Sequence, residues 1–407
     1  MMWLLNKVLT RLIRKGRVTL VDPDGKSRVF GAADPDFPDL VLTLHDHRVA
    51  RDIVFDPRLG FAEAYMDGRV TLSGGDIMDF IGLVRGNNPW EKGRQISPST
   101  PLRRAWRATG GRIRQINRRR ASRANVAHHY DLSATLYDLF LDAERQYSCA
   151  YWTPDTTGLE EAQQNKLRHI AAKLALKPGM KVLDIGCGWG GMAMFLHRHY
   201  GVDVTGITLS VEQITMAQER AKREGVADHV RFSLTDYRDM TGSFDRIVSV
   251  GMFEHVGTPN YREFFRTCHN LLTPDGVMLL HTIGRMGGPG TTDAFTQKYI
   301  FPGGYIPALS EIVSASEPNR LMVTDVESLR LHYAKTTRAW YDRVQKNRDA
   351  IEALYDARFF RLWSFYLAGA TAAFESGGML VYQLQYARDR HTLPITRDYI
   401  AQGEQVT

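Results

Sequence analysis

The sequence predicts a protein of the α/β class in which a doubly wound sheet follows a small α+β domain. Three observations lead to this prediction. After Lys181, short β-branched runs alternate regularly with amphipathic helical segments, as in a parallel sheet covered by helices. A glycine-rich turn, Gly186 to Gly190, follows the first of these runs. Polar residues gather at the carboxyl ends of the predicted strands, where sheets of this kind bind ligands.

The chain is 407 residues long, which is enough for two or three domains. We expect an N-terminal α+β domain at residues 1–90, a basic linker at 91–127 and the main α/β domain at 128–407. Within the main domain we expect a lid insertion at 284–320 and C-terminal helices. A hydrophobic content of 43% and a charged content of 24% are ordinary for a globular protein. Because no run of about 18 apolar residues occurs, we expect no membrane span.

The first 17 residues form a cationic amphipathic segment that predicts a helix. The apolar residues on one side of this helix are Leu4, Leu5, Val8, Leu9 and Leu12. The segment lacks the apolar core and cleavage site of a signal peptide. The helix is therefore expected either to pack against the protein or to touch a membrane. Residues 22–25 separate two β-rich runs and predict a hairpin.

A strongly basic stretch covers residues 92–123. From Lys92 to Tyr130 there is no Asp or Glu, but there are eleven Lys and Arg residues. One interpretation is a solvated linker between domains. A second is a surface for anionic phospholipid headgroups, since each basic residue near such a membrane adds about 1 kcal/mol of attraction. A nucleic-acid surface is less favoured, because no aromatic or groove-binding motif accompanies the charges, and we expect no nucleic-acid partner.

The glycine-rich turn predicts a cofactor pocket. Asp184 lies in the preceding strand, and Gly186, Gly188 and Gly190 alternate after it. Glycine lets the backbone approach a ligand closely, and the helix that follows presents free N–H groups. The alternation and the acidic residue suit a ligand with a cationic aminoacyl part better than a pyrophosphate. The alternative is a tight strand-to-helix turn without a ligand.

The rest of the main domain follows in regular order. Strands are predicted at residues 182–185, 202–207, 230–234, 245–250, 277–282, 322–328 and from 378. Helices are predicted at 160–176, 210–224, 260–272 and 359–374, and Asp131 or Ser133 is expected to cap a short helix. The cysteines, Cys149, Cys187 and Cys268, show no metal-type spacing, so we expect no metal and a reducing compartment.

Six motifs in this order resemble the cyclopropane-fatty-acyl-phospholipid synthases and the related mycolic acid cyclopropane synthases and methyltransferases. The motifs are HHYDLS, YSCAYW, VLDIGCGWGG, GITLSVEQ, SVGMFEHVG and LHTIG. The resemblance implies a Rossmann-like, S-adenosylmethionine (SAM)-dependent methyltransferase domain. It also implies transfer of a methylene carbon from SAM to the cis double bond of a phospholipid acyl chain, which forms a cyclopropane ring.

The resemblance further implies which residues bind SAM. The turn after the first strand would hold the aminoacyl group, and the YSCAYW segment would cover it. The end of the second strand would lie near the ribose, and the end of the third would flank the adenine. The corresponding residues are Asp184, Gly186, Gly188 and Gly190, then Tyr147 and Ser148, then Thr208, Leu209 and Gln213, then Asp236 and Tyr237.

By the same resemblance a bicarbonate ion would lie beside the methyl group and accept the proton lost on ring closure. Its ligands would be Cys149, Glu254, His281, the backbone of Ile283, and Tyr333. Each of these residues has an ordinary structural explanation when taken singly, and the complete set carries the argument. His255 is expected to face away from the site, because it directly follows Glu254.

Two alternatives remain open. One is a SAM-dependent acyl-chain methyltransferase that leaves a methyl or methylene branch. The other is a lipid-binding relative without catalysis. In the favoured interpretation the protein is cytoplasmic and associates peripherally with the inner face of the membrane, where it meets phospholipid acyl chains. By resemblance to the family, the N-terminal domain could also form a homodimer.

Overall fold

The computed structural model describes residues 1–93 and 133–405. All but the first two residues of the predicted basic stretch, and the predicted boundary at residues 127–128, lie outside this part of the chain. The described residues form two compact units. Unit 1 contains residues 1–93, 293–300 and 337–378, and unit 2 contains residues 133–292, 301–336 and 379–405.

Unit 1 is built on a four-stranded sheet in the order β2-β1-β3-β4. Its strands are β1 (Val18–Val21), β2 (Ser27–Phe30), β3 (Leu40–Leu44) and β4 (Val70–Ser73). β1 pairs antiparallel with β2 and parallel with β3. The predicted hairpin between β1 and β2 is confirmed. The Asp22 carboxylate accepts the N–H groups of Asp24 and Lys26 at 3.0 and 2.9 Å and so holds the turn.

Six α-helices lie wholly within the described part of unit 1. They are α1 (Met2–Leu12), α2 (Arg48–Phe55), α3 (Pro57–Met66), α4 (Ile77–Gly86), α14 (Arg348–Leu354) and α15 (Ala357–Glu375), with a short 3₁₀ turn η1 at Trp90–Lys92. The predicted N-terminal helix is confirmed as α1, but its buried face is narrower than expected. Leu5 and Leu9 are buried, whereas Leu4 is 37% exposed. An 11-residue helix on a small sheet can bury only one row of side chains, so the neighbouring row faces outward.

The C-terminal helical region is grouped with unit 1, whereas we expected it within the domain at 128–407. Helix α13 (His332–Lys346) begins in unit 2 and continues into unit 1, where it lies beside α15. The two helices are joined by Thr371 and Thr337 at 2.9 Å and by Gln345 and Ser364 at 2.9 Å. α15 also packs against α3 and α4. A helix that is apolar on several sides carries no sequence signal for which neighbour it will cover.

Unit 2 contains a seven-stranded sheet in the order β10-β11-β9-β8-β5-β6-β7. Its strands are β5 (Lys181–Ile185), β6 (Asp203–Thr208), β7 (Val230–Leu234), β8 (Phe244–Val250), β9 (Leu272–Arg285), β10 (Met322–Leu329) and β11 (Met379–Ala387). The five strands from β9 to β7 in this order are parallel, as predicted. The last two strands depart from this parallel arrangement, because β11 runs antiparallel to both β9 and β10.

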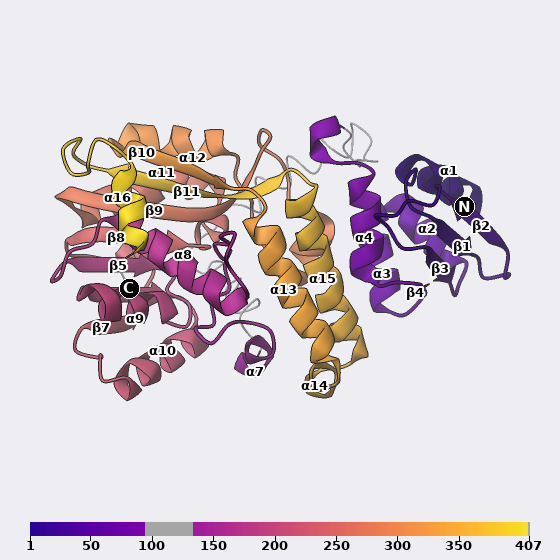
Figure 1. Ribbon diagram of the computed structural model, residues 1–407, viewed down its shortest axis with the longest axis horizontal. Coiled ribbons are helices and arrows are strands. Elements are labelled where there is room, and N and C mark those ends of the chain that lie inside the picture. The colour runs from indigo at the N-terminus through magenta and orange to yellow at the C-terminus, as the bar shows by residue number, and fades with distance from the viewer. Residues whose placement is uncertain (94–132, 406–407) are drawn as a thin grey trace. The chain divides into compact units, whose positions relative to one another are not determined.

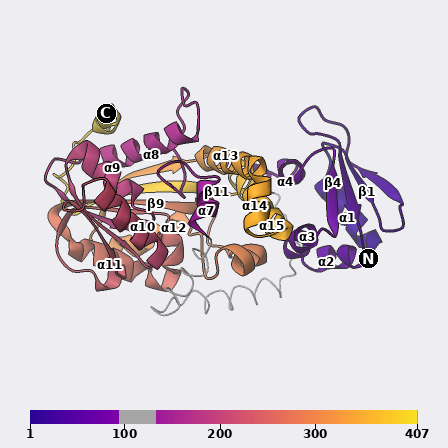
Figure 2. The same cartoon turned by 90° about the horizontal axis from the view of Figure 1, so that it is seen from below.

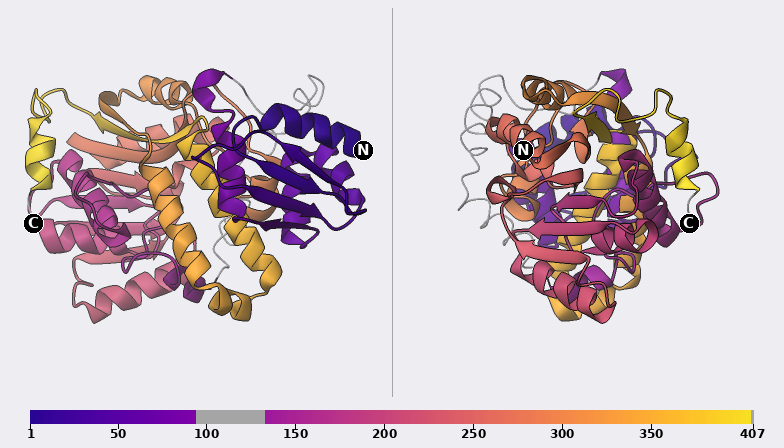
Figure 3. Two further views of the ribbon diagram at one scale, coloured as in Figure 1. Left: turned by 45° about the vertical axis from the view of Figure 1, so that its right-hand side comes forward. Right: turned by 90° about the vertical axis from the view of Figure 1, so that its left-hand side faces the viewer.

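Helices cover both faces of this sheet (Figure 2). One core contains residues of α8 (Leu159–Leu174), α9 (Gly191–Tyr200) and α10 (Val211–Arg223). The other contains residues of α11 (Tyr261–Leu271) and α12 (Leu309–Ser316). The sheet is therefore doubly wound. Figure 3 shows the strands of unit 2 stacked edge to edge between these layers. The C-terminal helix α16 (Asp398–Glu404) packs against α8.

Short elements complete unit 2. They are α7 (Ala134–Asp138), η2 (Tyr237–Asp239), η3 (Phe253–His255), η4 (Thr258–Asn260) and η6 (Glu317–Asn319). Ser133 caps α7 by accepting the N–H of Leu136, so one of the two predicted caps is confirmed. Ser210 likewise caps α10 at the N–H of Gln213.

The predicted lid insertion at 284–320 is not irregular throughout. β9 runs into it as far as Arg285, and it contains α12, which the sequence analysis missed. It also contains a π-helical turn, η5 (Thr296–Ile300), which belongs to unit 1. α12 lies within Gly- and Pro-rich sequence, and its start is held by Glu311, which accepts the N–H of Ala308 at 2.8 Å. Across residues 1–93 and 133–405, no helix has the length and apolarity needed to cross a membrane.

Candidate active site

The glycine-rich turn shapes one wall of a pocket at the carboxyl edge of the sheet. Gly186 adopts a φ of +86°, and a Cβ atom there would lie 2.8 Å from the Cβ atom of Met252. Gly188 adopts a φ of +52°, and a Cβ atom there would meet nothing within 4 Å. Gly186 thus allows close packing of the turn on the η3 segment, and Gly188 faces open space.

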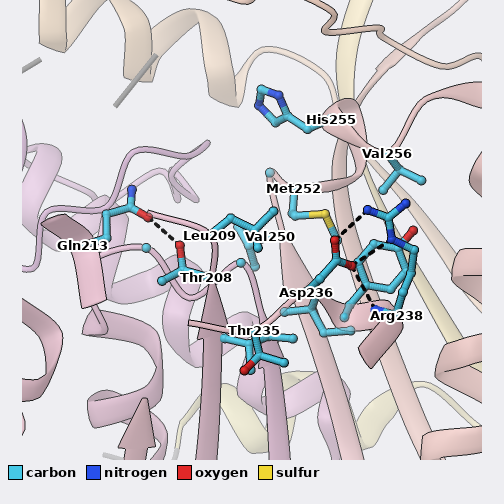
Figure 4. A pocket seen from close by; sticks show the side chains of 16 residues that line it. Thr208, Leu209, Gln213, Thr235, Asp236, Arg238, Val250, Met252, His255 and Val256 are labelled. Atoms are coloured by element: carbon cyan, nitrogen blue, oxygen red, sulfur yellow. Dashed lines mark hydrogen bonds and ion pairs between the residues drawn. The ribbon is translucent and has the colours of Figure 1, made fainter. Parts of the chain in front are cut away.

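Seven of the predicted cofactor residues line this pocket (Figure 4). They are Gly186, Gly188, Thr208, Leu209, Gln213, Asp236 and Tyr237. At one side the Thr208 hydroxyl donates to Gln213 Oε1 over 2.9 Å. This bond joins the end of β6 to the first turn of α10, and the cap at Ser210 fixes the same turn. The pocket therefore brings together the ends of three neighbouring parallel strands, as the alternation predicted.

At the other side of the pocket Asp236 is held by Arg238. The Arg238 guanidinium donates from Nε to Oδ1 over 2.9 Å and from Nη2 to Oδ2 over 2.6 Å, and the backbone N–H of Arg238 also donates to Oδ1 over 3.0 Å. These contacts raise the pKa of the guanidinium. Asp236 is therefore oriented before any ligand arrives.

Sequence reasoning missed part of the pocket lining. The additional residues include Thr235, Arg238, Val250, Met252, His255 and Val256. His255 is among the lining residues, but its ring lies edge-on against the Phe301 ring, with centroids 5.8 Å apart, and points away from the other labelled side chains in Figure 4, as expected. η3 is a 3₁₀ turn in which successive side chains point in different directions, so Glu254 and His255 project to different sides of it. Burial lowers the pKa of His255 to about 4, so its imidazole is neutral near pH 7.

Four predicted cofactor residues lie behind or beside the pocket rather than among its lining residues. Asp184 is 2% exposed in β5, and its Oδ2 atom has no hydrogen-bond partner. Burial raises the pKa of Asp184 to about 7. A Cβ atom at Gly190 would meet the Phe232 ring at 2.7 Å, so this glycine serves helix packing. Tyr147 packs edge-on against Tyr137, with ring centroids 5.5 Å apart. Ser148 is described with Lys166 below.

Glu254 is a buried carboxyl group at the end of β8. It is 7% exposed, and its Oε1 atom accepts the N–H of Ile283 over 2.6 Å. Its Oε2 atom is buried and has no partner. Burial raises the pKa of Glu254 to about 7, while the hydrogen bonds from Ile283 and Thr282 oppose the shift. Near neutral pH this group can hold or release a proton.

His281 lies on β9, two residues before Ile283, so both side chains project from the same face of the sheet. It is 2% exposed. Gln383, its direct partner on β11, donates from Nε2 to His281 Nδ1 over 3.2 Å. Burial moves the pKa of His281 well below its ordinary value. The ring is therefore neutral, and in the tautomer that accepts the Gln383 amide N–H at Nδ1 the ring proton resides on Nε2.

Cys149 and Tyr333 come from segments that Thr336 joins. Cys149 is 1% exposed, and burial raises the pKa of its thiol, so the thiol is protonated. The next residue, Ala150, donates its N–H to Thr336 Oγ1 over 3.1 Å. Thr336 lies one turn after Tyr333 on α13, and Tyr333 is 7% exposed. Within the predicted bicarbonate set, a hydrogen bond joins Glu254 to Ile283. Thr336 links the segment of Cys149 to the helix that carries Tyr333.

A sheet of this topology, with a glycine turn after β5 and a pocket at the ends of β5, β6 and β7, defines a SAM-dependent methyltransferase. A coclaurine N-methyltransferase bound to N-methylheliamine and SAH shares the fold at 19% identity, with a TM-score of 0.65 over 81% of this chain and 99% of its own. The chain belongs to the mycolic acid cyclopropane synthetase family, whose sequence model matches residues 117–384. The family resemblance of the motifs is thus confirmed.

Relatives of known activity extend over most of the chain. The cyclopropane-fatty-acyl-phospholipid synthase of Escherichia coli K12 is 41% identical over 330 residues, covering 81% of this chain and 83% of its own. A tuberculostearic acid methyltransferase of Mycobacterium tuberculosis is 34% identical over 407 residues, covering 94% of this chain and 91% of its own. The mycolic acid cyclopropane synthase CmaA1, solved with SAH and CTAB, is 38% identical with a TM-score of 0.62, covering 65% of this chain and 98% of its own.

Proposed function

We propose that this methyltransferase transfers a methylene carbon from SAM to the cis double bond of unsaturated phospholipid acyl chains and forms a cyclopropane ring. The family and the 41% identity to a synthase of this activity support the proposal. The observation that carries the chemistry is a buried Glu254 carboxyl group that titrates near pH 7 and accepts the N–H of Ile283, two residues after the neutral His281 on β9.

The pocket residues fit SAM. When bound, SAM supplies an electrophilic methyl group on a sulfonium. The chain's part is to hold it in line with a weakly nucleophilic alkene, and such positioning contributes up to about 7–11 kcal/mol. Thr208 and Gln213 present hydroxyl and amide groups at the end of β6, where the ribose is expected. Asp236, oriented by Arg238, presents carboxylate oxygens where the adenine amino group is expected.

The other residues fit a bicarbonate ion. Bicarbonate, when bound, supplies a base for the proton that ring closure releases. The His281 Nε2–H group is a donor for a carboxylate oxygen. The unpartnered Oε2 atom of Glu254 is an acceptor for the ion's own proton. The N–H of Ile283 is already bonded to Glu254, so Ile283 acts here by orienting that carboxyl group. The thiol of Cys149 is protonated and can donate as well.

A second candidate is an acyl-chain methyltransferase that leaves a methyl or methylene branch. The 34% identity to a tuberculostearic acid methyltransferase over 94% of this chain favours it. Both candidates use SAM and the same pocket, and they differ in how the carbon skeleton is completed after methyl transfer. Ring closure removes a proton from the former methyl, and a methylene branch would lose the same proton after a hydride shift, so a base serves either outcome and the carbon skeleton of the product distinguishes the candidates.

The lipid substrate requires contact with a membrane surface, and α1 offers one. Trp3 is 68% exposed, Met1 48% and Leu4 37%, and Lys7 lies 5.2 Å from the centroid of the Trp3 ring. Phe55, at the end of α2, is 58% exposed, and α2 packs against α1. An exposed aromatic residue flanked by cations is typical of helices that lie in the interface of an anionic bilayer. We propose peripheral association through this patch. The predicted homodimer and inner-leaflet location stay predictions.

The activity is tested by incubating the protein with SAM, bicarbonate and vesicles of a cis-monounsaturated phospholipid, followed by mass spectrometry of the acyl chains. We expect a gain of one CH₂ and loss of the double bond. The rate should fall when carbon dioxide and bicarbonate are removed and recover when bicarbonate is restored. A rate that does not respond to bicarbonate would exclude the proposed base.

Membrane association is tested by vesicle sedimentation with Trp3→Ser. Because burial of one large apolar side chain contributes about 1.5–3 kcal/mol, we expect partitioning onto anionic vesicles to weaken by about tenfold. Ile395→Ser removes an apolar side chain that is fully exposed in unit 2 and serves as the matched control. Equal partitioning of Trp3→Ser and the unsubstituted protein would argue against docking through α1.

A further inference from the structure

A buried lysine lies behind the segment that precedes Cys149. Lys166 is on α8 and is 0% exposed. A charged lysine in the interior is costly unless its ammonium group is fully hydrogen-bonded. Its ammonium donates to Ser148 Oγ over 3.0 Å and also to Gln146 Oε1. The lysine therefore fixes two side chains of a segment that has no regular secondary structure.

A second residue of α8 holds the backbone of the same segment. Gln163, one turn before Lys166, donates from Nε2 to the carbonyl oxygens of Gln146 at 3.2 Å and Ser148 at 3.0 Å. Residues 146–148 are thus bonded to α8 through both side chains and main chain. Gln146 in turn lies against the start of α9, because a Cβ atom at Gly191 would approach its Nε2 atom to 2.6 Å. The segment is wedged between α8 and the glycine turn.

The charge of Lys166 also reaches the acidic and catalytic groups around it. It interacts electrostatically with Asp142, Cys149, Asp184 and Glu144, which raise its pKa against the larger effect of burial. The net effect lowers the pKa of Lys166 to about 8. Its positive charge also lowers the pKa of His281. Lys166 is therefore a buried cation whose charge acts both on Asp184, beside the glycine turn, and on His281, in the predicted bicarbonate set.

We propose that Lys166 is a positioning residue for the aminoacyl end of SAM. By donating to Ser148 Oγ, it leaves the hydroxyl proton of Ser148 free to point toward an anionic group on the pocket side. Its positive charge favours a carboxylate at that place. This inference rests on the proposed SAM-binding role of Ser148. It assigns Lys166 a role through Ser148 and not in contact with the reacting atoms.

The test measures SAH binding by calorimetry, because SAH carries the same carboxylate and cannot turn over. We expect Lys166→Met to weaken SAH binding by about tenfold or more, as expected for loss of a charge-assisted contact. Lys173→Met is the matched control. Lys173 is equally buried on α8, but it pairs with Asp325 and Glu327. We expect this variant to lose stability and to bind SAH as the unsubstituted protein does.

Ser148→Ala keeps the test decisive if Lys166→Met does not fold. It should weaken SAH binding to a similar extent, and the double variant should lose little more than either single one, because both act through one hydroxyl. SAH binding within about twofold of the unsubstituted protein, in either folded single variant, would overturn the inference. If the unsubstituted protein itself does not bind SAH, the proposed SAM site fails rather than the role of Lys166 within it.

Discussion

Replacement of Glu254 by Gln gives a quantitative test of the site's electrostatics. The pKa of Glu254 is raised from 4.5 to about 7, chiefly by burial. At 1.36 kcal/mol per pKa unit, ionising this carboxyl costs about 3 kcal/mol more in the folded protein than in the unfolded chain. Because the folded pKa is the higher one, the protonated carboxyl favours folding. This contribution is complete below pH 4.5 and is lost as the pH rises through 7.

Glu254→Gln removes this pH dependence because the amide is neutral at every pH. Between pH 5 and pH 8 the unsubstituted protein should lose about 2.5 kcal/mol of stability that the variant keeps. With about 2–4 °C per kcal/mol for domains of this size, the Tm difference, variant minus unsubstituted, should rise by about 5–10 °C. Any cost of the unpartnered amide hydrogens does not change with pH, so it cancels from this comparison.

The assay is thermal unfolding of both proteins at pH 5, 6, 7 and 8, without SAM or bicarbonate. Glu219→Gln, an exposed carboxyl on α10, is the control and should give a Tm difference that does not change with pH. A flat Tm difference for Glu254→Gln, or one that falls toward pH 8, would refute the assignment of a buried, high-pKa carboxyl at this position.

Two further substitutions test the environment of His281 and the packing of the glycine turn. Gln383→Leu removes the hydrogen bond that fixes the ring proton of His281, so we expect kcat to fall by about 10–100-fold with SAH affinity unchanged, measured by initial rates and calorimetry. Gly186→Ala places a Cβ atom 2.8 Å from Met252 at a φ of +86°, so we expect about 1–3 kcal/mol of destabilisation and weaker SAH binding. Gly225→Ala, with a φ of +71° and open space around it, should destabilise the protein without changing SAH binding. Equal SAH affinities for the two alanine variants would contradict the role given to Gly186.

Local patterns in the sequence were sufficient to predict the parallel part of the sheet and seven of the residues that line the pocket at its carboxyl edge. Alternation of β-branched runs with amphipathic segments places β5, β6 and β7 side by side, and polar residues at their ends then meet at one edge. Thr208 and Asp236 were found in this way. The cap residue Ser210 was also readable, because capping depends only on neighbours within one turn.

Contacts between segments that are distant in the sequence could not be predicted from local patterns. β11 inserts between β9 and β10, and only this register places Gln383 opposite His281. Nothing in the sequence around Gln383 distinguishes it from a polar residue on an exposed strand face. Lys166 presents the same difficulty, because a lysine in a helix usually extends into solvent. Arg238 follows Asp236 by two residues, so its proximity could have been found by considering local side-chain pairs.

The fate of the SAM methyl group tests the central claim most directly. The protein is incubated with SAM carrying a CD₃ methyl group, bicarbonate and vesicles of a cis-monounsaturated phospholipid, and the isolated acyl chains are examined by mass spectrometry and NMR. The account predicts a ring carbon that keeps two of the three deuterium atoms, loss of the double bond, and no branched methyl group. A product that keeps all three deuterium atoms in a methyl branch, or one that keeps its unsaturation, would contradict ring closure at the site built from Glu254 and His281.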